Sequence, residues 1–140
     1  MVHALQEARR VLKPNGILID LRPMPFHRRV AISRAGQDQF VGVMREKFDG
    51  DRAANRAVAE VLREKLFRPG IRLQFNCNRA TDSVEEFQEW LDEFTRLGNL
   101  PSHDWLLKRL EQAWRGKSGK AKIVVSGPLK LQVLRKVEVR

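Results

Sequence analysis

The beginning of the chain combines a helical pattern, a break and an apolar run. Apolar residues recur at helical spacing up to Leu12, with basic residues between them. The sequence Pro14–Gly16 cannot continue a helix, so we expect the helix to end near Lys13. The run Ile17–Leu21 is apolar except for Asp20, which is typical of a strand that is covered on both faces inside an α/β sheet.

The next apolar pattern predicts a hairpin followed by a helix. Two β-like runs, Val30–Arg34 and Phe40–Met44, are separated by the five-residue sequence AGQDQ, which is long enough for a hairpin loop. Asp49 and Asp51 then offer caps for an amphipathic helix that we expect to continue to about Phe67 and to cover the sheet.

A strand with one buried face is expected after Pro69-Gly70, which should break the preceding helix. Apolar and polar residues alternate there, and the apolar positions predicted to face the core are Ile71, Leu73, Phe75 and Cys77. The sequence therefore places the thiol of Cys77 on the core side.

Two further helices are expected in the second half of the chain. Ser83 and Glu86 have the spacing of a capping box, and an apolar stripe at helical spacing continues from there to Gly98. A second helix should begin at Pro101-Ser102 and end near Gly116.

The last segment is β-like but contains a proline. Ile123–Val125 and Leu129–Val137 have strand patterns, and Ser126–Pro128 separates them. Because proline cannot donate to a central ladder, we expect a bend or tight hairpin there. The whole order of elements predicts a small mixed sheet with flanking helices, of α/β or α+β type, in one domain spanning residues 1–140.

Composition limits the class of protein. The 140 residues contain no apolar run near the roughly 20 needed to span a bilayer, so we expect a soluble protein with no membrane segment. The single Cys77 cannot form an internal disulfide, and the N-terminus lacks a signal-like apolar core. Both observations favour a cytoplasmic location.

The charge is strongly basic and unevenly distributed. The formal net charge is +10, with seven Lys/Arg against two acids in residues 1–34 and eight against one in residues 115–140. Residues 82–111 instead carry eight acids against three bases. The strongly positive net charge suggests nucleic acid as a partner. The uneven distribution of charge is equally compatible with association between subunits.

One local sequence resembles a known family. ALQEARRVLKPNGILIDLRP, residues 4–23, is similar to the helix and fifth strand of class I S-adenosylmethionine-dependent methyltransferases, where a helix ending in RVLKPGG enters an apolar strand. The resemblance continues through residues 48–67, 79–94 and 122–136. It implies a partial Rossmann-like methyltransferase sheet, with this chain corresponding to the C-terminal half of such an enzyme.

The same resemblance suggests that the chain does not bind the cofactor alone. In the family, a glycine-rich loop after the first strand and an acid after the second hold S-adenosylmethionine, and both lie upstream of the half that this chain resembles. We therefore expect a half-domain that is not catalytic alone, with no catalytic or cofactor-binding residue of its own. S-adenosylmethionine would bind only if a partner or an N-terminal half supplied the site.

Few residues are candidates for chemistry. Arg22 and His27 follow the apolar strand, where open α/β sheets hold ligands, so they are the candidate substrate-side residues. An ion-paired Arg22 and a surface His27 are the structural alternatives. Asp20 would be costly to bury unpaired, and we expect a nearby arginine as its partner. No Cys/His spacing indicates a metal site.

The same strand also suggests how the chain associates. In the resembled fold it has a fourth strand on one side and the C-terminal strands on the other, so its edge at Ile17–Leu21 should be open here. We expect a homodimer, or a complementing chain, joined along that edge. The alternative function is a small basic binding module for nucleic acid or an acidic protein. Weak, salt-sensitive binding of nucleic acid is then expected from the charge alone.

Overall fold

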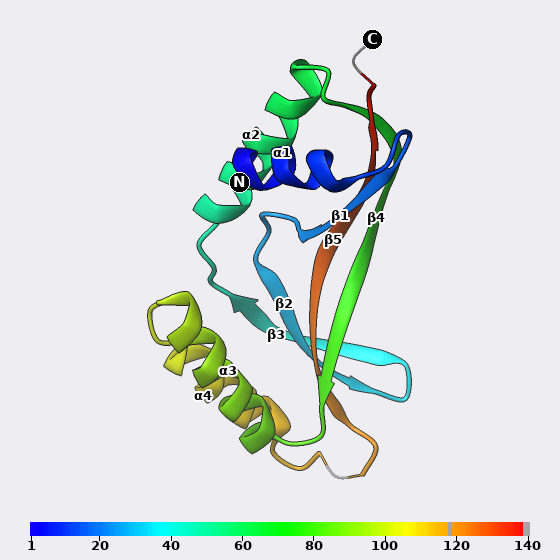
Figure 1. Cartoon of the computed structure of the whole chain (residues 1–140). Helices are drawn as coiled ribbons and strands as arrows, with labels where there is room; N and C mark the ends of the chain where they lie inside the picture. Colours follow the sequence, from blue (N-terminus) through cyan, green and yellow to red (C-terminus); the bar gives the residue numbers. More distant parts are fainter. Residues whose placement is uncertain (118, 139–140) are drawn as a thin grey trace. The chain divides into compact units, whose positions relative to one another are not determined.

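A computed structural model describes residues 1–117 and 119–138, and the chain forms two compact units (Figure 1). Unit 1 comprises Met1–Pro25, Phe48–Phe75 and the segment from Pro128 to the last described residue. Unit 2 comprises Phe26–Lys47 and Asn76–Gly127. The expectation of a single domain over residues 1–140 stays a prediction.

The described residues form four helices and five strands. The helices are α1 (Val2–Val11), α2 (Asp49–Arg63), α3 (Val84–Gly98) and α4 (Asp104–Trp114). The strands are β1 (Ile17–Pro23), β2 (Arg28–Arg34), β3 (Gln37–Met44), β4 (Phe67–Thr81) and β5 (Lys122–Lys136). The strand order is β1-β5-β2-β3, with β4 also paired to β5. The expected mixed α/β class is therefore confirmed, with a mostly antiparallel open sheet.

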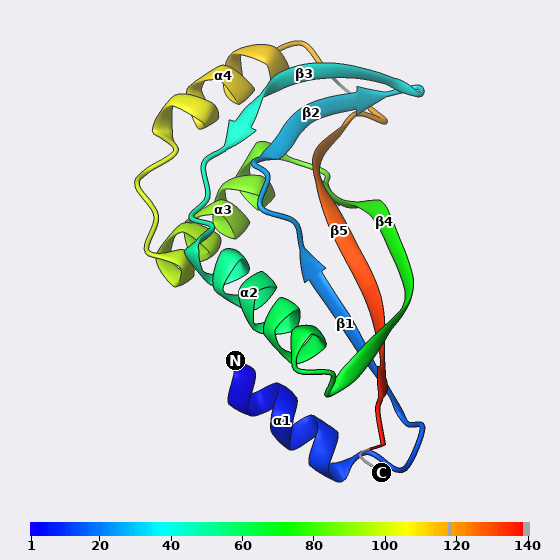
Figure 2. The ribbon, with the colours of Figure 1, turned by 90° about the horizontal axis from the view of Figure 1, so that it is seen from above.

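In unit 1, two helices cover one face of an antiparallel strand pair (Figure 2). β1 pairs with the second half of β5, and Ile19 lies opposite Val133. Leu18 and Leu134 face the helices, and a core forms there with apolar side chains of α1, α2 and the start of β4. Arg9 of α1 donates to the backbone oxygens of Leu66 and Val137 and so fixes the helix to this core.

The prediction that β1 is covered on both faces is wrong. Ile17, Ile19 and Leu21 are exposed, and Ile19 keeps 57% of its surface. Both helices of unit 1 pack on the opposite face, so alternate residues of β1 remain bare. β1 is also at the end of the strand order, and among the described residues its only strand partner is β5.

β4 departs from its sequence pattern in a similar way. Phe67 belongs to this strand and not to the preceding helix, because α2 ends at Arg63 and Lys65 has a positive φ of 58°. Pro69-Gly70 lies within β4, where a proline is tolerated because the strand pairs with β5 alone. The alternating apolar residues are exposed and the predicted core position of Cys77 is wrong.

Unit 2 begins with the predicted hairpin, although its turn is shorter than expected. Arg34 pairs with Gln37, which leaves only Ala35-Gly36 between β2 and β3. Both turn residues have positive φ values, 50° and 77°, as the tightest hairpin turns require. The two strands therefore extend into the residues that the sequence assigned to a five-residue loop.

Helices α3 and α4 supply the rest of the core of unit 2. Ser83 Oγ accepts the N–H of Glu86 at 3.1 Å, which confirms the predicted cap, whereas the Glu86 carboxylate accepts the N–H of Asp82. Apolar side chains of both helices pack on the hairpin and on β5, and the buried members of this core are Val30, Ile32, Val41, Met44, Val84, Phe87, Leu91, Leu106, Leu110, Ala121, Ile123 and Val125.

β5 is one continuous strand, so the bend or hairpin expected at Ser126–Pro128 is wrong. The reason is a change of partner: Ser126 pairs with β2, and Leu129 already pairs with Pro23 of β1. Gly127 and Pro128 lie between the residues paired with β2 and those paired with β1. The missing N–H of Pro128 therefore removes no hydrogen bond from either pairing. The Pro128 oxygen still accepts the N–H of Met24 at 2.9 Å.

Candidate functional site

A cluster of charged and polar side chains lies on the helix-covered face of unit 1, at the carboxyl end of β1. The Asp20 carboxylate accepts two hydrogen bonds from Arg22, at 2.6 and 2.7 Å. Arg22 also donates to Asn55 Oδ1 of α2 at 3.1 Å, and the Lys130 ammonium donates to the same oxygen. The guanidinium of Arg22 is therefore held by Asp20 of its own strand and by Asn55 of α2.

Lys130 is the unusual member of this cluster. It lies opposite Arg22 in the β1–β5 register, so two cations face each other across neighbouring strands. Its side chain is 7% exposed. Burial lowers the pKa of the Lys130 ammonium, and the charge of Arg22 lowers it further, while Asp20 acts in the opposite direction.

Sequence reasoning missed Lys130 because the pattern indicates the wrong face of the strand. Leu129, Leu131 and Val133 alternate with Lys130 and Gln132, which is typical of an apolar core face and a polar solvent face. The structure reverses this: the two polar residues are buried and the three apolar ones are only half-buried. Like-charged residues in a covered position are the kind of feature found at functional sites as well as in structural networks.

The second candidate, His27, belongs to unit 2, so the structure does not join it with Arg22 in one unit. Its Nδ1 accepts the backbone N–H of Glu46 at 3.2 Å, in an exposed position. The Glu46 carboxylate in turn accepts the backbone N–H of Arg28. These contacts fix the chain before β2 to the chain after β3, which is a structural role.

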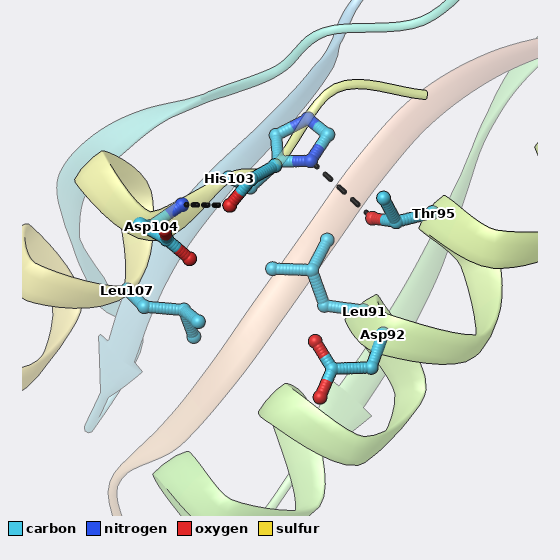
Figure 3. Close-up of a pocket in the computed structure, with 7 residues that line it drawn as sticks. Leu91, Asp92, Thr95, His103, Asp104 and Leu107 are labelled. Carbon is cyan, nitrogen blue, oxygen red and sulfur yellow. Dashed lines mark hydrogen bonds between the residues drawn. The ribbon is translucent and has the colours of Figure 1, made fainter. Parts of the chain in front are cut away.

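A different histidine has the more constrained environment. His103, just before α4, is 3% exposed and lines an open pocket of about 230 Å³ with Leu91, Asp92, Thr95, Ser102, Asp104 and Leu107 (Figure 3). Its Nε2 accepts the N–H of Arg45 at 3.0 Å. Burial lowers the pKa of the imidazole, as does the charge of Arg45. No motif in the sequence marks this residue.

Apolar surface is the other conspicuous feature of unit 1. On the face opposite the helices, Ile19 lies beside Val133 and Leu21 beside Leu131. β4 exposes a second row, formed by Ile71, Leu73 and Phe75. Large exposed apolar areas on soluble domains are commonly contact surfaces, and here one of them adjoins the free edge of β1.

Within residues 1–117 and 119–138, no three His, Cys, Asp or Glu side chains come together as metal ligands. The helices of this described part are too short or too polar to cross a membrane. Comparisons of the chain with protein-family models, with curated proteins and with solved structures give no match.

Proposed function

We propose that this chain is a methyltransferase-like half-domain that does not catalyse alone and is completed by a second chain along β1. The observation that carries the proposal is the open, apolar edge of β1: it has β5 on one side and no strand on the other among the described residues. An apolar strand with a free row of backbone donors and acceptors needs a cover.

The order of helices and strands along the chain supports the half-domain proposal. α1 leads directly into β1, α2 lies between β1 and β4 in the chain, and the final strand β5 pairs with both β1 and β4. In the resembled fold the C-terminal strands flank one side of the fifth strand, and the fourth strand occupies the other. β1 has one C-terminal neighbour, β5, and within the described residues it has no strand on its other side.

The bare face of unit 1 supports the same proposal. Sheets of doubly wound proteins carry helices on both faces, whereas α1 and α2 share one face here. Ile17, Ile19 and Leu21 lie on the other. A completing chain would therefore supply both a strand for the edge and apolar cover for this face.

The simplest completing chain is a second copy. Two β1 strands related by a twofold axis pair antiparallel and form a continuous sheet. The substrate-side assignment of Arg22 and His27 depends on this larger assembly, and S-adenosylmethionine would bind only if the partner or an N-terminal half supplied its cradle.

Two measurements on the purified chain test the proposal. Light scattering should give the mass of a dimer at micromolar concentration, and calorimetry with S-adenosylmethionine should give no saturable binding. A monomer at all concentrations removes the self-pairing proposal. Saturable binding that S-adenosylhomocysteine competes removes the half-domain proposal, because the chain would then hold a cofactor site of its own.

The alternative function, a basic binding module for nucleic acid or an acidic protein, is favoured by one observation. The described residues of unit 1 contain 13 of the 27 Lys/Arg and 7 of the 17 Asp/Glu, a net charge of +6 out of the total of +10. If charge alone acts, binding to an RNA or DNA oligonucleotide should fade steeply as salt approaches physiological concentration. Sequence-selective binding that persists there would favour the module over the half-domain.

A further inference from the structure

Three segments of unit 2 meet at one buried residue, His103. Its Nε2 accepts the backbone N–H of Arg45, the residue that follows β3. Its Nδ1 faces the hydroxyl of Thr95 on α3 at 3.4 Å (Figure 3). Its own backbone oxygen accepts the N–H groups of Leu106 and Leu107 in the first turn of α4.

This geometry requires a neutral ring. Nε2 accepts a hydrogen bond and so carries no proton, which leaves the proton on Nδ1, where it can be donated to the Thr95 hydroxyl. A second proton on Nε2 would point at the N–H of Arg45, and two donors would oppose each other. The Arg45 N–H would then lose its acceptor in a hydrogen bond that is partly buried.

The charged groups around the ring do not offset a second proton. The Arg45 guanidinium lies 5.8 Å from the ring of Trp105, and its charge acts against an imidazolium. Lys47 donates to the backbone oxygen of Asn99 at 2.8 Å, close in sequence to His103. Asp92 and Asp104 line the neighbouring pocket, and among the described residues neither forms an ion pair with the ring.

We propose that His103 is a proton-controlled clasp, which holds the start of α4 and the end of α3 against the end of β3 and releases them on acidification. The neutral ring contacts the end of β3 and α3 through Arg45 and Thr95, and the backbone oxygen of the same residue holds the first turn of α4. Protonation removes the link to Arg45 and places a cation in a covered position. The release also opens the pocket wall formed by His103 and exposes Leu91 and Leu107, which line that pocket.

The direction of the pH dependence follows from the burial of the ring. Burial, with the charge of Arg45, lowers the pKa of His103 in the closed form, whereas an exposed imidazole titrates near 6.5. Between those two values the open form binds more protons than the closed form. The clasp is therefore fully effective above about pH 6.5 and is weakened as the pH falls below that value, by up to about tenfold per pH unit.

Amide hydrogen exchange, corrected for the intrinsic effect of pH, tests the clasp directly. Protection of the Arg45 amide and of the first turn of α4 should fall by roughly tenfold between pH 7.5 and pH 5.5. Core amides of unit 1, such as that of Leu134, should keep their protection, which separates local release from global unfolding. Unchanged protection at Arg45 would overturn the proposal.

Two glutamine variants make the assignment specific. His103→Gln keeps an oxygen that can accept the Arg45 N–H and has no group that titrates in this range, so its exchange should lose the pH dependence. His27→Gln is the control, because His27 is exposed, and it should behave like the wild type. If His103→Gln folds and shows the wild-type pH response, another group is responsible.

Titration of the wild-type chain keeps the proposal testable if His103→Gln does not fold. The chain contains only three histidines, His3, His27 and His103, so their ring resonances can be followed separately by NMR. The His103 ring should titrate at a lower pH than a free imidazole, whose pKa is about 6.5. A His103 that titrates at or above that value would rule out the clasp.

Discussion

Asp20 and Arg22 form a two-pronged ion pair within a single strand. Arg22 Nε lies 2.6 Å from one carboxylate oxygen of Asp20, and a second guanidinium nitrogen lies 2.7 Å from the other. The two side chains are two residues apart, on the helix-covered face of β1, and only 11% and 13% of their surfaces are exposed. The sequence-based prediction that a nearby arginine pairs with Asp20 is therefore confirmed.

We expect Asp20→Ala to lower the free energy of unfolding by about 3 kcal/mol, because the covered guanidinium of Arg22 would lose its carboxylate partner. Urea denaturation of the wild type and the variant measures the difference. The exposed pair Glu7–Arg10, at 2.8 Å on α1, is the matched control. Glu7→Ala should cost less than about 1 kcal/mol, and equal losses in the two variants would contradict the importance of burial.

Lys130→Met should instead raise the free energy of unfolding at neutral pH, by about 1 kcal/mol. The substitution removes a covered ammonium that faces Arg22, while Asn55 Oδ1 keeps its hydrogen bond from Arg22. Methionine has a similar length and suits the covered position. Urea denaturation at pH 7 measures the effect, with Lys13→Met on the surface as the control. A loss of stability in Lys130→Met would show that the ammonium strengthens the fold.

The advantage of Lys130→Met should disappear at high pH. The pKa of Lys130 is lowered in the folded chain, and a free lysine titrates near 10.4. Between these values the unfolded wild type binds more protons, so the stability contribution of this residue rises with pH. The difference in unfolding free energy between the variant and the wild type should therefore shrink as the pH approaches 10.4.

How much of the fold could be predicted from sequence depends on where the deciding contacts lie. The start of α3 is determined by Ser83 and Glu86 within four residues, so its cap was predictable. The length of α2 was overestimated because Lys65 adopts a left-handed conformation that its residue type does not indicate. The exposure of Ile19 could not be predicted, because the pattern does not reveal that both helices pack on one face.

The residues of the candidate sites could also be predicted only in part from the sequence. Arg22 was identified because it follows an apolar strand, and Lys130 was missed because its contacts come from residues more than 70 positions away along the chain, such as Asn55. His103 depends on Arg45, 58 positions away. Long-range contacts of this kind leave no spacing signal, so the environments that alter the pKa of these two groups become visible only in the structure.

Gly42 of β3 provides a test of packing in unit 2. A Cβ at this position would lie 3.0 Å from a methyl carbon of Leu106 and 3.2 Å from the ring of Trp105, both on α4. We expect Gly42→Ala to lower the free energy of unfolding by about 2 kcal/mol, because α4 would be forced away from the hairpin.

The matched control for this variant is Gly50→Ala. Gly50 lies in the first turn of α2, and a Cβ there would meet nothing within 4 Å. Since alanine is the better helix former, this substitution should raise the unfolding free energy by about 0.5 kcal/mol. Thermal unfolding of both variants measures whether the free energy of unfolding falls in Gly42→Ala and rises in Gly50→Ala. A Gly42→Ala variant as stable as the wild type would show that α4 packs more loosely on β3.

The proposed pairing of two chains along β1 is most directly tested at Ile19, in the middle of the exposed row. Lysine is the residue that natural edge strands use against pairing, and here it would also place two further cations at a twofold interface. We expect Ile19→Lys to weaken dimerisation at least tenfold, which corresponds to about 1.4 kcal/mol. Sedimentation over a range of concentrations measures the dissociation constant of each variant.

Leu97→Lys is the control for Ile19→Lys, because it adds the same charge to an exposed leucine of α3 in unit 2. It should dimerise like the wild type if the contact is at β1. Equal weakening in both variants would point to the net charge of the chain and not to this strand. If the wild type dimerises and neither substitution weakens it, two copies associate through another surface, and β1 remains available for a different completing chain.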